Sequence, residues 1–407
     1  MRKARLFAGT FIRYVKSSKY WCRESGILLL SMLISLVNIP RIEPPRFANQ
    51  ERSFFKVGSL GALNSRDAFI TSSEINSPTP IVHSPTITEI SSDPHDGSKS
   101  FLIMWFGGSR EGSADVNIFQ TTMRMSKAGE TDWSDPTAIL TRRYIEQTYK
   151  QRNLKLGNPV LTKLEGESVI LHFVTTSYGG WSCSHINWME SPNGGRTWSS
   201  PKRLITSPFL DFSFLVRNPG ILMEDGSLGL PIYHEFINKH GEWIRVSRAG
   251  RILEKTRIET PEPALQPAVA TLSPTQAVCL LRDAGKNDKK IQWAETKNGG
   301  VSWEYRPPRN ISNPDSAASL LKLEDQSLLM ASNPIQQGRH RLALLQSVDA
   351  GESWREIKVI EESPNPEDEF SYPTLLQDHE GLIHLVYSYK RRLIKHLAFS
   401  PSWLNAP

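Results

Sequence analysis

One eight-residue motif, which occurs three times, limits what this chain can fold into. The motif reads Ser/Thr-x-Asp/Asn-x-Gly-x-Thr/Ser-Trp, with copies at residues 191–198, 296–303 and 347–354 and a weaker copy at 126–133. In each copy the Asp or Asn side chain can accept hydrogen bonds from backbone N–H groups further along, and the Gly supplies φ > 0. We expect the Trp to pack back against its own sheet. Turns built repeatedly by one rule predict a repeat architecture.

The spacing of the motifs predicts the size of the repeat. The Trp residues that close the four copies are Trp133, Trp198, Trp303 and Trp354. Their successive separations are 65, 105 and 51 positions, so the middle interval is about twice the last. We expect a degenerate copy near its middle, at Ser247–Arg251. A period of about 50 residues filled by short strands suits a four-stranded propeller blade, and the chain from about Leu60 onward has room for roughly six.

Short apolar strands separated by turn residues predict an all-β domain. The clearest candidates are Thr86–Ile90, Phe101–Phe106, Val169–Thr175, Leu228–Tyr233, Ala277–Leu281, Ser327–Ala331, Leu342–Gln346 and Leu382–Tyr387. The 27 Pro and 26 Gly residues are spread between such strands, and no long amphipathic helix is evident in this part. The predicted fold is therefore an all-β, six-bladed β-propeller over residues 66–407, behind an N-terminal hydrophobic anchor.

The first 65 residues are typical of a targeting region. We predict a basic cytoplasmic tail at residues 1–25, a signal anchor or signal peptide at 26–40 and a linker at 41–65. The apolar stretch is shorter than the roughly 20 residues of a comfortable membrane span, but extension back to Tyr20 gives a tilted span. No Ala-x-Ala-like cleavage site follows it, which favours an uncleaved anchor. We expect a membrane-anchored or secreted protein with its propeller on the extracytoplasmic side.

The net charge of +6 does not indicate nucleic-acid binding. Of 48 basic and 42 acidic residues, nine and two lie in residues 1–46, which leaves 39 basic and 40 acidic residues for the remainder. A nearly neutral domain lacks the electrostatic footprint for a phosphate backbone. The three Cys residues have no paired spacing, and no metal-binding His or Cys pattern or phosphate-binding glycine loop is present. We therefore expect neither a metal nor a cofactor.

The repeated motif on a presumed six-bladed propeller resembles the aspartate box of the sialidase (neuraminidase) superfamily. The resemblance covers nearly all of residues 75–407. It implies an exo-acting glycoside hydrolase that removes a terminal sialic acid or a related acidic sugar from a glycan. Lyases and non-catalytic binding propellers also carry aspartate boxes, so the functional positions decide between these activities.

Two functional positions of the family have matches early in the chain, and one does not. Sialidases usually carry Arg-Ile-Pro before the first inner strand, and its arginine is the first of the triad. A hairpin follows, with a further arginine outside the triad and then an acid/base Asp. The resemblance implies that Asp115 is the acid/base and that Arg110 contacts the substrate. His83 stands where the first arginine of the family's carboxylate-binding triad would be.

The other functional positions lie in the second half of the chain. Arg282, in Leu-Leu-Arg-Asp, matches the second triad arginine, and Arg339, eight residues before Ser347, matches the third. Tyr372, in Tyr-Pro-Thr-Leu, matches the nucleophilic tyrosine. Gln266 occupies the place of the family's glutamate, which assists the nucleophile.

These residue types suit an anionic sugar. Planar guanidinium groups bind a carboxylate through paired, charge-assisted hydrogen bonds. A carboxylate nucleophile would be repelled by the charge of the substrate, and a tyrosine replaces it in sialidases. The general acid needs a raised pKa. Because Gln266 cannot take the phenolic proton, Glu235, Glu111 or another group must do so. Arg217, which follows an apolar strand, is a candidate for the missing arginine contact.

Two other activities stay open at this point. The chain could be a lyase acting on uronic-acid polysaccharides, with Tyr372 or His83 as the base and the arginines neutralising the uronate. It could equally be a non-catalytic glycan-binding propeller, which the replaced arginine and glutamate favour.

Overall fold

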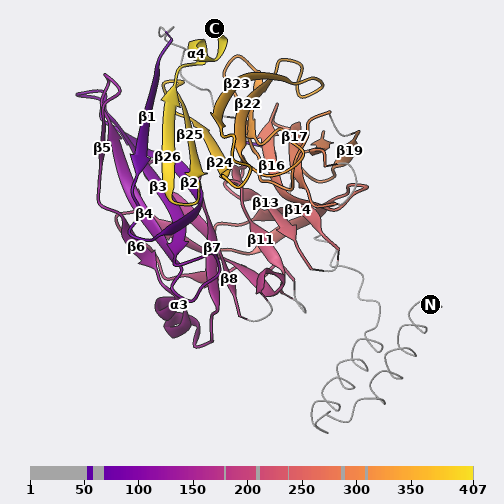
Figure 1. Ribbon diagram of the computed structural model, residues 1–407. Coiled ribbons are helices and arrows are strands. Elements are labelled where there is room, and N and C mark those ends of the chain that lie inside the picture. Colours follow the sequence, from indigo (N-terminus) through magenta and orange to yellow (C-terminus); the bar gives the residue numbers. More distant parts are fainter. Residues whose placement is uncertain are drawn as a thin grey trace, which may run out of the picture. The chain divides into compact units, whose positions relative to one another are not determined.

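Six antiparallel β-sheets are arranged as the blades of a propeller (Figure 1). They are seen in a computed structural model that describes residues 53–57, 68–177, 180–207, 211–236, 238–285, 289–307 and 310–406. The predicted fold class, an all-β six-bladed propeller, is confirmed. The predicted tail and apolar segment, and the linker apart from residues 53–57, lie outside the described residues. Within the part described, no helix is both long and apolar enough to cross a membrane.

Each blade is a meander of neighbouring hairpins that runs from an innermost strand to an outermost one. Blade 1 consists of β2 (Ile81–Ser92), β3 (Lys99–Gly108), β4 (Asn117–Met125) and β5 (Thr131–Trp133), with β6 (Thr137–Leu140) also pairing with β4. Blade 2 consists of β7 (Lys155–Lys163), β8 (Val169–Thr176), β9 (Ser184–Ser191) and β10 (Lys202–Arg203). Blade 3 has a divided inner strand, β11 (Phe214–Val216) and β12 (Ile221–Leu222), followed by β13 (Leu228–His234), β14 (His240–Val246) and β15 (Ile252–Ile258).

The remaining blades follow the same plan. Blade 4 consists of β16 (Ala264–Thr271), β17 (Ala277–Asp283), β18 (Gln292–Thr296) and β19 (Glu304–Arg306). Blade 5 consists of β20 (Ser319–Lys322), β21 (Leu328–Ser332), β22 (Arg341–Ser347) and β23 (Arg355–Glu362). Blade 6 consists of β24 (Phe370–Gln377), β25 (Ile383–Tyr389), β26 (Leu393–Phe399) and β1 (Ile70–Ile75). The described helices are short, namely α3 (Arg142–Tyr149), the 3-10 turn Gly180–Cys183 and α4 (Pro401–Asn405).

The first described strand closes the ring. Strand β1 pairs with β26 from Ile70↔Phe399 to Ile75↔Ile394, so the N-terminal strand completes the last blade (Figure 1). A buried ion pair also joins the first and last blades, because Lys99 Nζ lies 2.5 Å from Asp378 Oδ2. Strand β1 therefore covers the edge that β26 would otherwise expose.

The repeated motif forms the turn between the third and fourth strands of a blade. In the three full copies the first hydroxyl accepts a hydrogen bond from the N–H of the fifth residue; the pairs are Ser191–Gly195 (2.8 Å), Thr296–Gly300 (3.0 Å) and Ser347–Gly351 (2.8 Å). The predicted degenerate copy is confirmed in blade 3, where the Ser247 hydroxyl accepts from the N–H of Arg251 at 3.1 Å.

Glycine is required in these turns because each turn packs on the preceding blade. Gly300 of blade 4 has φ 92°, and a Cβ there would lie 2.4 Å from Trp243 Nε1 of blade 3. Gly250 of blade 3 has φ 78°, and a Cβ there would lie 2.7 Å from Trp188 Nε1 of blade 2. The motif therefore joins neighbouring blades as well as reversing the chain. The expectation that its Trp packs on its own sheet was wrong, because the Trp303 ring of blade 4 lies 5.8 Å from the Trp243 ring of blade 3.

A short segment ahead of the propeller packs against blades 3 and 4. Phe55 is fully buried, with its ring centroid 5.8 Å from that of Trp243, and its N–H donates to the carbonyl of Pro274 at 2.8 Å. Part of the span predicted as a linker is thus in contact with the propeller.

Inner strands bend at equivalent points in four blades, and in blade 5 the chain bends just ahead of the inner strand β20. The residues with positive φ there are Ser84 (53°), Asn158 (46°), Gln266 (53°), Asp315 (60°) and Tyr372 (55°). Four of them precede a proline, and at those four the pairing with the second strand shifts register. Such bulges re-aim side chains. Because the bulges lie near the starts of the inner strands, they gather chemically active side chains at one end of the propeller axis.

Candidate active site

Tyr372 lies at the centre of a cluster of cationic and aromatic side chains. Its ring centroid is 4.2 Å from that of His83, and the Cζ atoms of Arg217 and Arg339 lie 5.3 and 5.4 Å from it. These residues come from blades 6, 1, 3 and 5. A guanidinium over an aromatic face contributes about 0.5–2 kcal/mol, more when it is desolvated. Residues far apart in the sequence therefore meet at one phenol.

Arg282 extends the cluster to blade 4. Its Nη1 donates to Gln266 Oε1 at 3.0 Å, and its Nε lies 2.5 Å from Asp315 Oδ1. The Gln266 amide also donates to the Tyr233 hydroxyl at 3.4 Å. Gln266 is thus a neutral bridge within the cluster and supplies no proton acceptor comparable to a carboxylate.

Glu369 separates two arginines. Its Oε1 accepts from Arg339 Nη1 at 3.1 Å, while its Oε2 lies 3.6 Å from Arg391 Nη1. Arg339 Nη2 also donates to the backbone carbonyl of Asp315 at 2.9 Å, and Arg391 forms an ion pair with Glu111. The charges therefore alternate in sign along an arc around Tyr372.

Sequence reasoning missed Asp315, Glu369 and Arg391, since none lies at a position that the family resemblance picks out. For Arg391 a signal was available. The turn Lys390-Arg391-Arg392 connects strands β25 and β26. It consists of three basic residues, although Gly or Asn would be expected in so tight a turn.

Arg217 lies within the protein, behind the phenol. It is 1% exposed, its Nη2 donates to the carbonyl of Pro373 at 2.9 Å, and its Nη1 donates to Thr374 Oγ1 at 3.3 Å. Burial lowers the pKa of Arg217 to about 10, so it stays charged at neutral pH. The guanidinium thus holds the backbone that follows Tyr372.

His83 is buried and uncharged. Burial, and then the positive charges of Arg391, Arg339, Arg217 and Arg282, hold its pKa well below the ordinary histidine value. All four guanidinium groups must therefore lie close enough to act on one imidazole. His83 therefore contributes an uncharged ring to this cluster, whereas an arginine at the same position would contribute a positive charge.

The turn that carries Arg110 and Asp115 lies at the same end of the propeller. It follows β3, whose Gly107 pairs with Val82 beside His83. Asp115 accepts hydrogen bonds from the N–H (2.9 Å) and hydroxyl (3.0 Å) of Ser109. In the described structure no hydrogen bond or ion pair links Arg110 or Asp115 to the Tyr372 cluster. Slight desolvation would raise the pKa of Asp115, but the Ser109 hydrogen bonds outweigh it and hold the pKa below the ordinary value.

Glu235, at the end of β13, differs from Asp115. Burial raises the pKa of its carboxyl above the ordinary value, opposed by the charges of Lys239 and Arg282. Asp315 and Glu111 also act on it electrostatically, which places it near the same arc of charges. Its raised pKa has the direction that a general acid needs.

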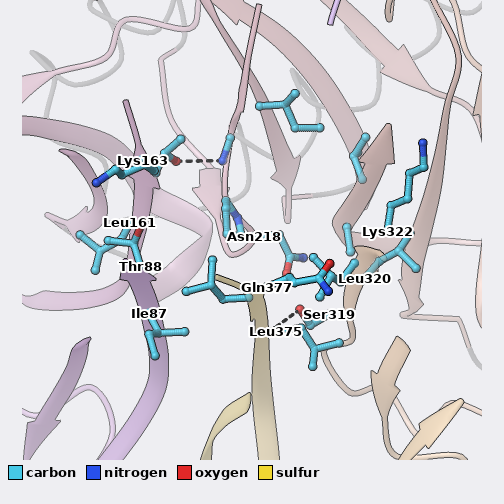
Figure 2. A pocket seen from close by; sticks show the side chains of 18 residues that line it. Ile87, Thr88, Leu161, Lys163, Asn218, Ser319, Leu320, Lys322, Leu375 and Gln377 are labelled. Atoms are coloured by element: carbon cyan, nitrogen blue, oxygen red, sulfur yellow. Dashed lines mark hydrogen bonds between the residues drawn. The ribbon is translucent and has the colours of Figure 1, made fainter. Parts of the chain in front are cut away.

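A separate cavity of about 290 Å³ lies further along the inner strands (Figure 2). Lys163 and Lys322 lie on opposite sides of it, and each donates to a backbone carbonyl at 2.9 Å. Among the described residues that line this cavity none carries a carboxyl, imidazole or phenol, so the cluster around Tyr372 is the better candidate site. The described residues hold no group of three or more His, Cys, Asp or Glu side chains arranged for a metal ion.

Solved structures that match this fold include sialidases and trans-sialidases at low sequence identity. A Hadza microbial sialidase matches with a TM-score of 0.64 at 17% identity, covering 79% of this chain and 66% of its own. The Trypanosoma rangeli sialidase matches with 0.61 at 12%, covering 82% and 60%. An intramolecular trans-sialidase from Ruminococcus gnavus matches with 0.61 at 12%, covering 81% and 96%. The chain thus spans less than two thirds of the first two proteins, and the likeness establishes the fold.

The family model for a BNR repeat-like domain matches residues 99–385, which cover most of the propeller. No curated protein matches the chain in sequence. On the family match, the repeated turns and the six blades, the chain belongs to the BNR repeat-like domain family.

Proposed function

We propose that this protein is a sialidase-like exo-glycoside hydrolase that removes a terminal sialic acid or a related acidic sugar. The observation that carries the proposal is the convergence of Tyr372 with arginines from blades 3, 4 and 5. A phenol surrounded by guanidinium groups suits a substrate that carries a carboxylate on or near its reacting carbon. The solved relatives with the same fold agree with this class of substrate.

In the proposed reaction a neighbouring base such as Glu111 takes the phenolic proton of Tyr372 as its oxygen attacks the anomeric carbon, and a carboxylic acid protonates the departing glycosidic oxygen. Water then cleaves the tyrosyl–sugar bond. The carboxylate that acted as the acid accepts a proton from this water, and the base returns its proton to the departing Tyr372 oxygen. Arg282 and Arg339 bind the sugar carboxylate. Arg217 supports the backbone after the nucleophile from behind the phenol. For the acid we propose Asp115 or Glu235, because one has the position that the family resemblance implies and the other the raised pKa.

Hydrolysis of a 4-methylumbelliferyl sialoside by the full-length chain tests this proposal. We expect turnover by the wild type, a fall in kcat of about 10²–10⁴-fold for Asp115→Ala if it is the acid, and at least as large a loss for Tyr372→Phe. Glu235→Gln distinguishes the two acids. Tyr144→Phe, which alters an exposed tyrosine on α3, should leave turnover unchanged. Equal turnover in wild type and Tyr372→Phe would contradict the proposal.

A second candidate is a non-catalytic propeller that binds acidic glycans. The neutral amide of Gln266 and the lowered pKa of Asp115 favour it. Binding of acidic glycans without turnover, unaltered by Asp115→Ala, would identify this function. An unsaturated product that absorbs in the ultraviolet would instead indicate a lyase. The N-terminal membrane anchor and extracytoplasmic location remain proposals from the sequence.

A further inference from the structure

Arg391 lies beside the position where the sequence lacks an arginine. It follows β25 in a tight turn, and Lys390 and Arg391 both have positive φ (50° and 57°). The backbone carbonyl of Arg391 accepts a hydrogen bond from the N–H of Val82 at 2.8 Å, next to His83 in the sequence. The turn of blade 6 is therefore fastened to the inner strand of blade 1, and its side chain starts from the His83 side of the cluster.

The Arg391 guanidinium shares a carboxylate with Arg339. Arg339 Nη1 and Arg391 Nη1 approach different oxygens of Glu369, at 3.1 and 3.6 Å. The longer separation is an ion pair beyond hydrogen-bond distance. The side chain of Arg391 is 33% exposed, so solvent reaches it. Arg391 is thus accessible to solvent, is held by Glu111, and makes only a longer contact with Glu369.

The hydrogen bonding of Arg391 is incomplete. Its Nε is buried and has no hydrogen-bond partner, whereas Arg339 donates from both Nη atoms. The nearby charges are also unbalanced. Arg282, Arg339 and Arg391 pair with the carboxylates of Asp315, Glu369 and Glu111. Arg217 adds a fourth guanidinium group, which donates to the neutral oxygens of Pro373 and Thr374. A ligand with one negative charge would neutralise this excess of positive charge. Glu235 lies near the same arc of charges, and its raised pKa favours the uncharged form of its carboxyl.

We propose that Arg391 is the third carboxylate-binding guanidinium of the site, acting with Arg282 and Arg339 on the acid group of the sugar. This inference rests on the proposed function for its class of ligand. It assigns to a hairpin turn of blade 6 the contact that the start of β2 cannot make, because His83 there is buried and uncharged. Arg391 therefore determines selectivity for an acidic over a neutral sugar.

The Glu111 contact allows a different explanation, which a variant can separate. Arg391 pairs with Glu111, in the turn that carries Arg110 and Asp115. If Arg391 only held that turn in place, Glu111→Gln would reproduce the effect of removing Arg391. If Arg391 binds the ligand carboxylate, Glu111→Gln should weaken binding much less.

The test measures dissociation constants of the full-length chain for N-acetylneuraminate, glucuronate and N-acetylneuraminate methyl ester. Arg391→Gln should weaken binding of the better carboxylate ligand by about 10- to 100-fold, as expected for hydrogen bonds to a charged group. Binding of the uncharged methyl ester should change little. Arg391→Lys keeps the charge without the planar fork and should fall between, which provides a second variant if Arg391→Gln folds poorly. Arg392→Gln, the exposed neighbour in the same turn, is the matched control.

The outcomes distinguish this inference from the proposed function. The role of Arg391 is supported if Arg391→Gln, but neither Glu111→Gln nor Arg392→Gln, loses affinity for the carboxylate ligand and keeps its affinity for the methyl ester. If the wild type in that case shows no turnover of a sialoside, only the hydrolase proposal fails. Wild-type affinity in Arg391→Gln and Arg391→Lys overturns the role of Arg391 and leaves hydrolysis intact. Equal losses in Glu111→Gln and Arg391→Gln also overturn it. No binding of either sugar acid by the wild type overturns both.

Discussion

Tyr372 combines a left-handed backbone with a ring enclosed by an imidazole and two guanidinium groups. Such a backbone costs of the order of 1–3 kcal/mol in a residue other than glycine, so the surroundings must hold it. Arg217 does this from within the protein, through the Pro373 carbonyl and the ring. The phenol is therefore fixed before any ligand arrives, as positioning for catalysis requires.

Buried histidines make stability depend on pH. Burial lowers the pKa of His172 to about 3, and the pKa values of His83 and His396 are also lowered, chiefly by burial. As pH falls through about 6.5, these groups gain protons in the unfolded chain while remaining neutral in the folded one. The free energy of unfolding should therefore fall below pH 6.5, with each such histidine approaching about 1.4 kcal/mol per pH unit.

Urea unfolding between pH 7 and 5 checks this prediction. His172→Gln should reduce the slope of the unfolding free energy with pH by the share of one histidine, whatever its effect on stability at pH 7. Comparing the two proteins cancels the contribution of Glu235, whose raised pKa acts in the opposite direction. Identical slopes in both proteins would show that His172 titrates alike in the folded and unfolded states.

At the scale of elements, the motif turn is the joint between blades. We predict that Gly300→Ala destabilises the propeller by about 2–4 kcal/mol, combining left-handed backbone strain with the clash against Trp243. Gly166→Ala is the matched control, because Gly166 also has positive φ (61°) but a Cβ there has no neighbour within 4 Å. It should cost only about 1–2 kcal/mol. Thermal unfolding of both variants measures the difference, and equal losses would remove the packing role of Gly300.

The sequence predicts some strands of a blade better than others. The second strands, for example β3, β8 and β17, are buried on both faces and show as continuous apolar runs, so each was predicted close to its observed bounds. The inner strands β7, β16 and β24 were not among the predicted strands. They carry a proline and a bulge, which break the periodic pattern that identifies a strand.

Similar limits apply to the site. Tyr372, Arg282 and Arg339 stood in recognisable sequence contexts, and the structure brings them to one cluster. Glu369 and Arg391 have no such context, since their proximity comes from blade geometry alone. For Arg110 and Asp115 the sequence supplied a role but the described contacts do not connect them to Tyr372, so their parts in the reaction remain predictions.

For the molecule as a whole, the candidate site exists only when the ring is closed. Its members come from blades 1, 3, 4, 5 and 6. His83 and Arg391 lie where blades 1 and 6 meet, because the N–H of Val82 donates to the Arg391 carbonyl there. Strand β1 completes blade 6, and the buried Lys99–Asp378 pair joins blades 6 and 1. No single blade could supply both the phenol and the cations.

The central claim is that this closed ring presents Tyr372 as a nucleophile toward an anionic sugar. Incubation with 2,3-difluorosialic acid, which is seen as a covalent intermediate in the Trypanosoma rangeli sialidase, followed by peptide mass spectrometry tests it directly. We predict one sugar adduct on the peptide that contains Tyr372, absent from Tyr372→Phe. An adduct on another residue, or turnover of a sialoside that persists in Tyr372→Phe, would contradict the account.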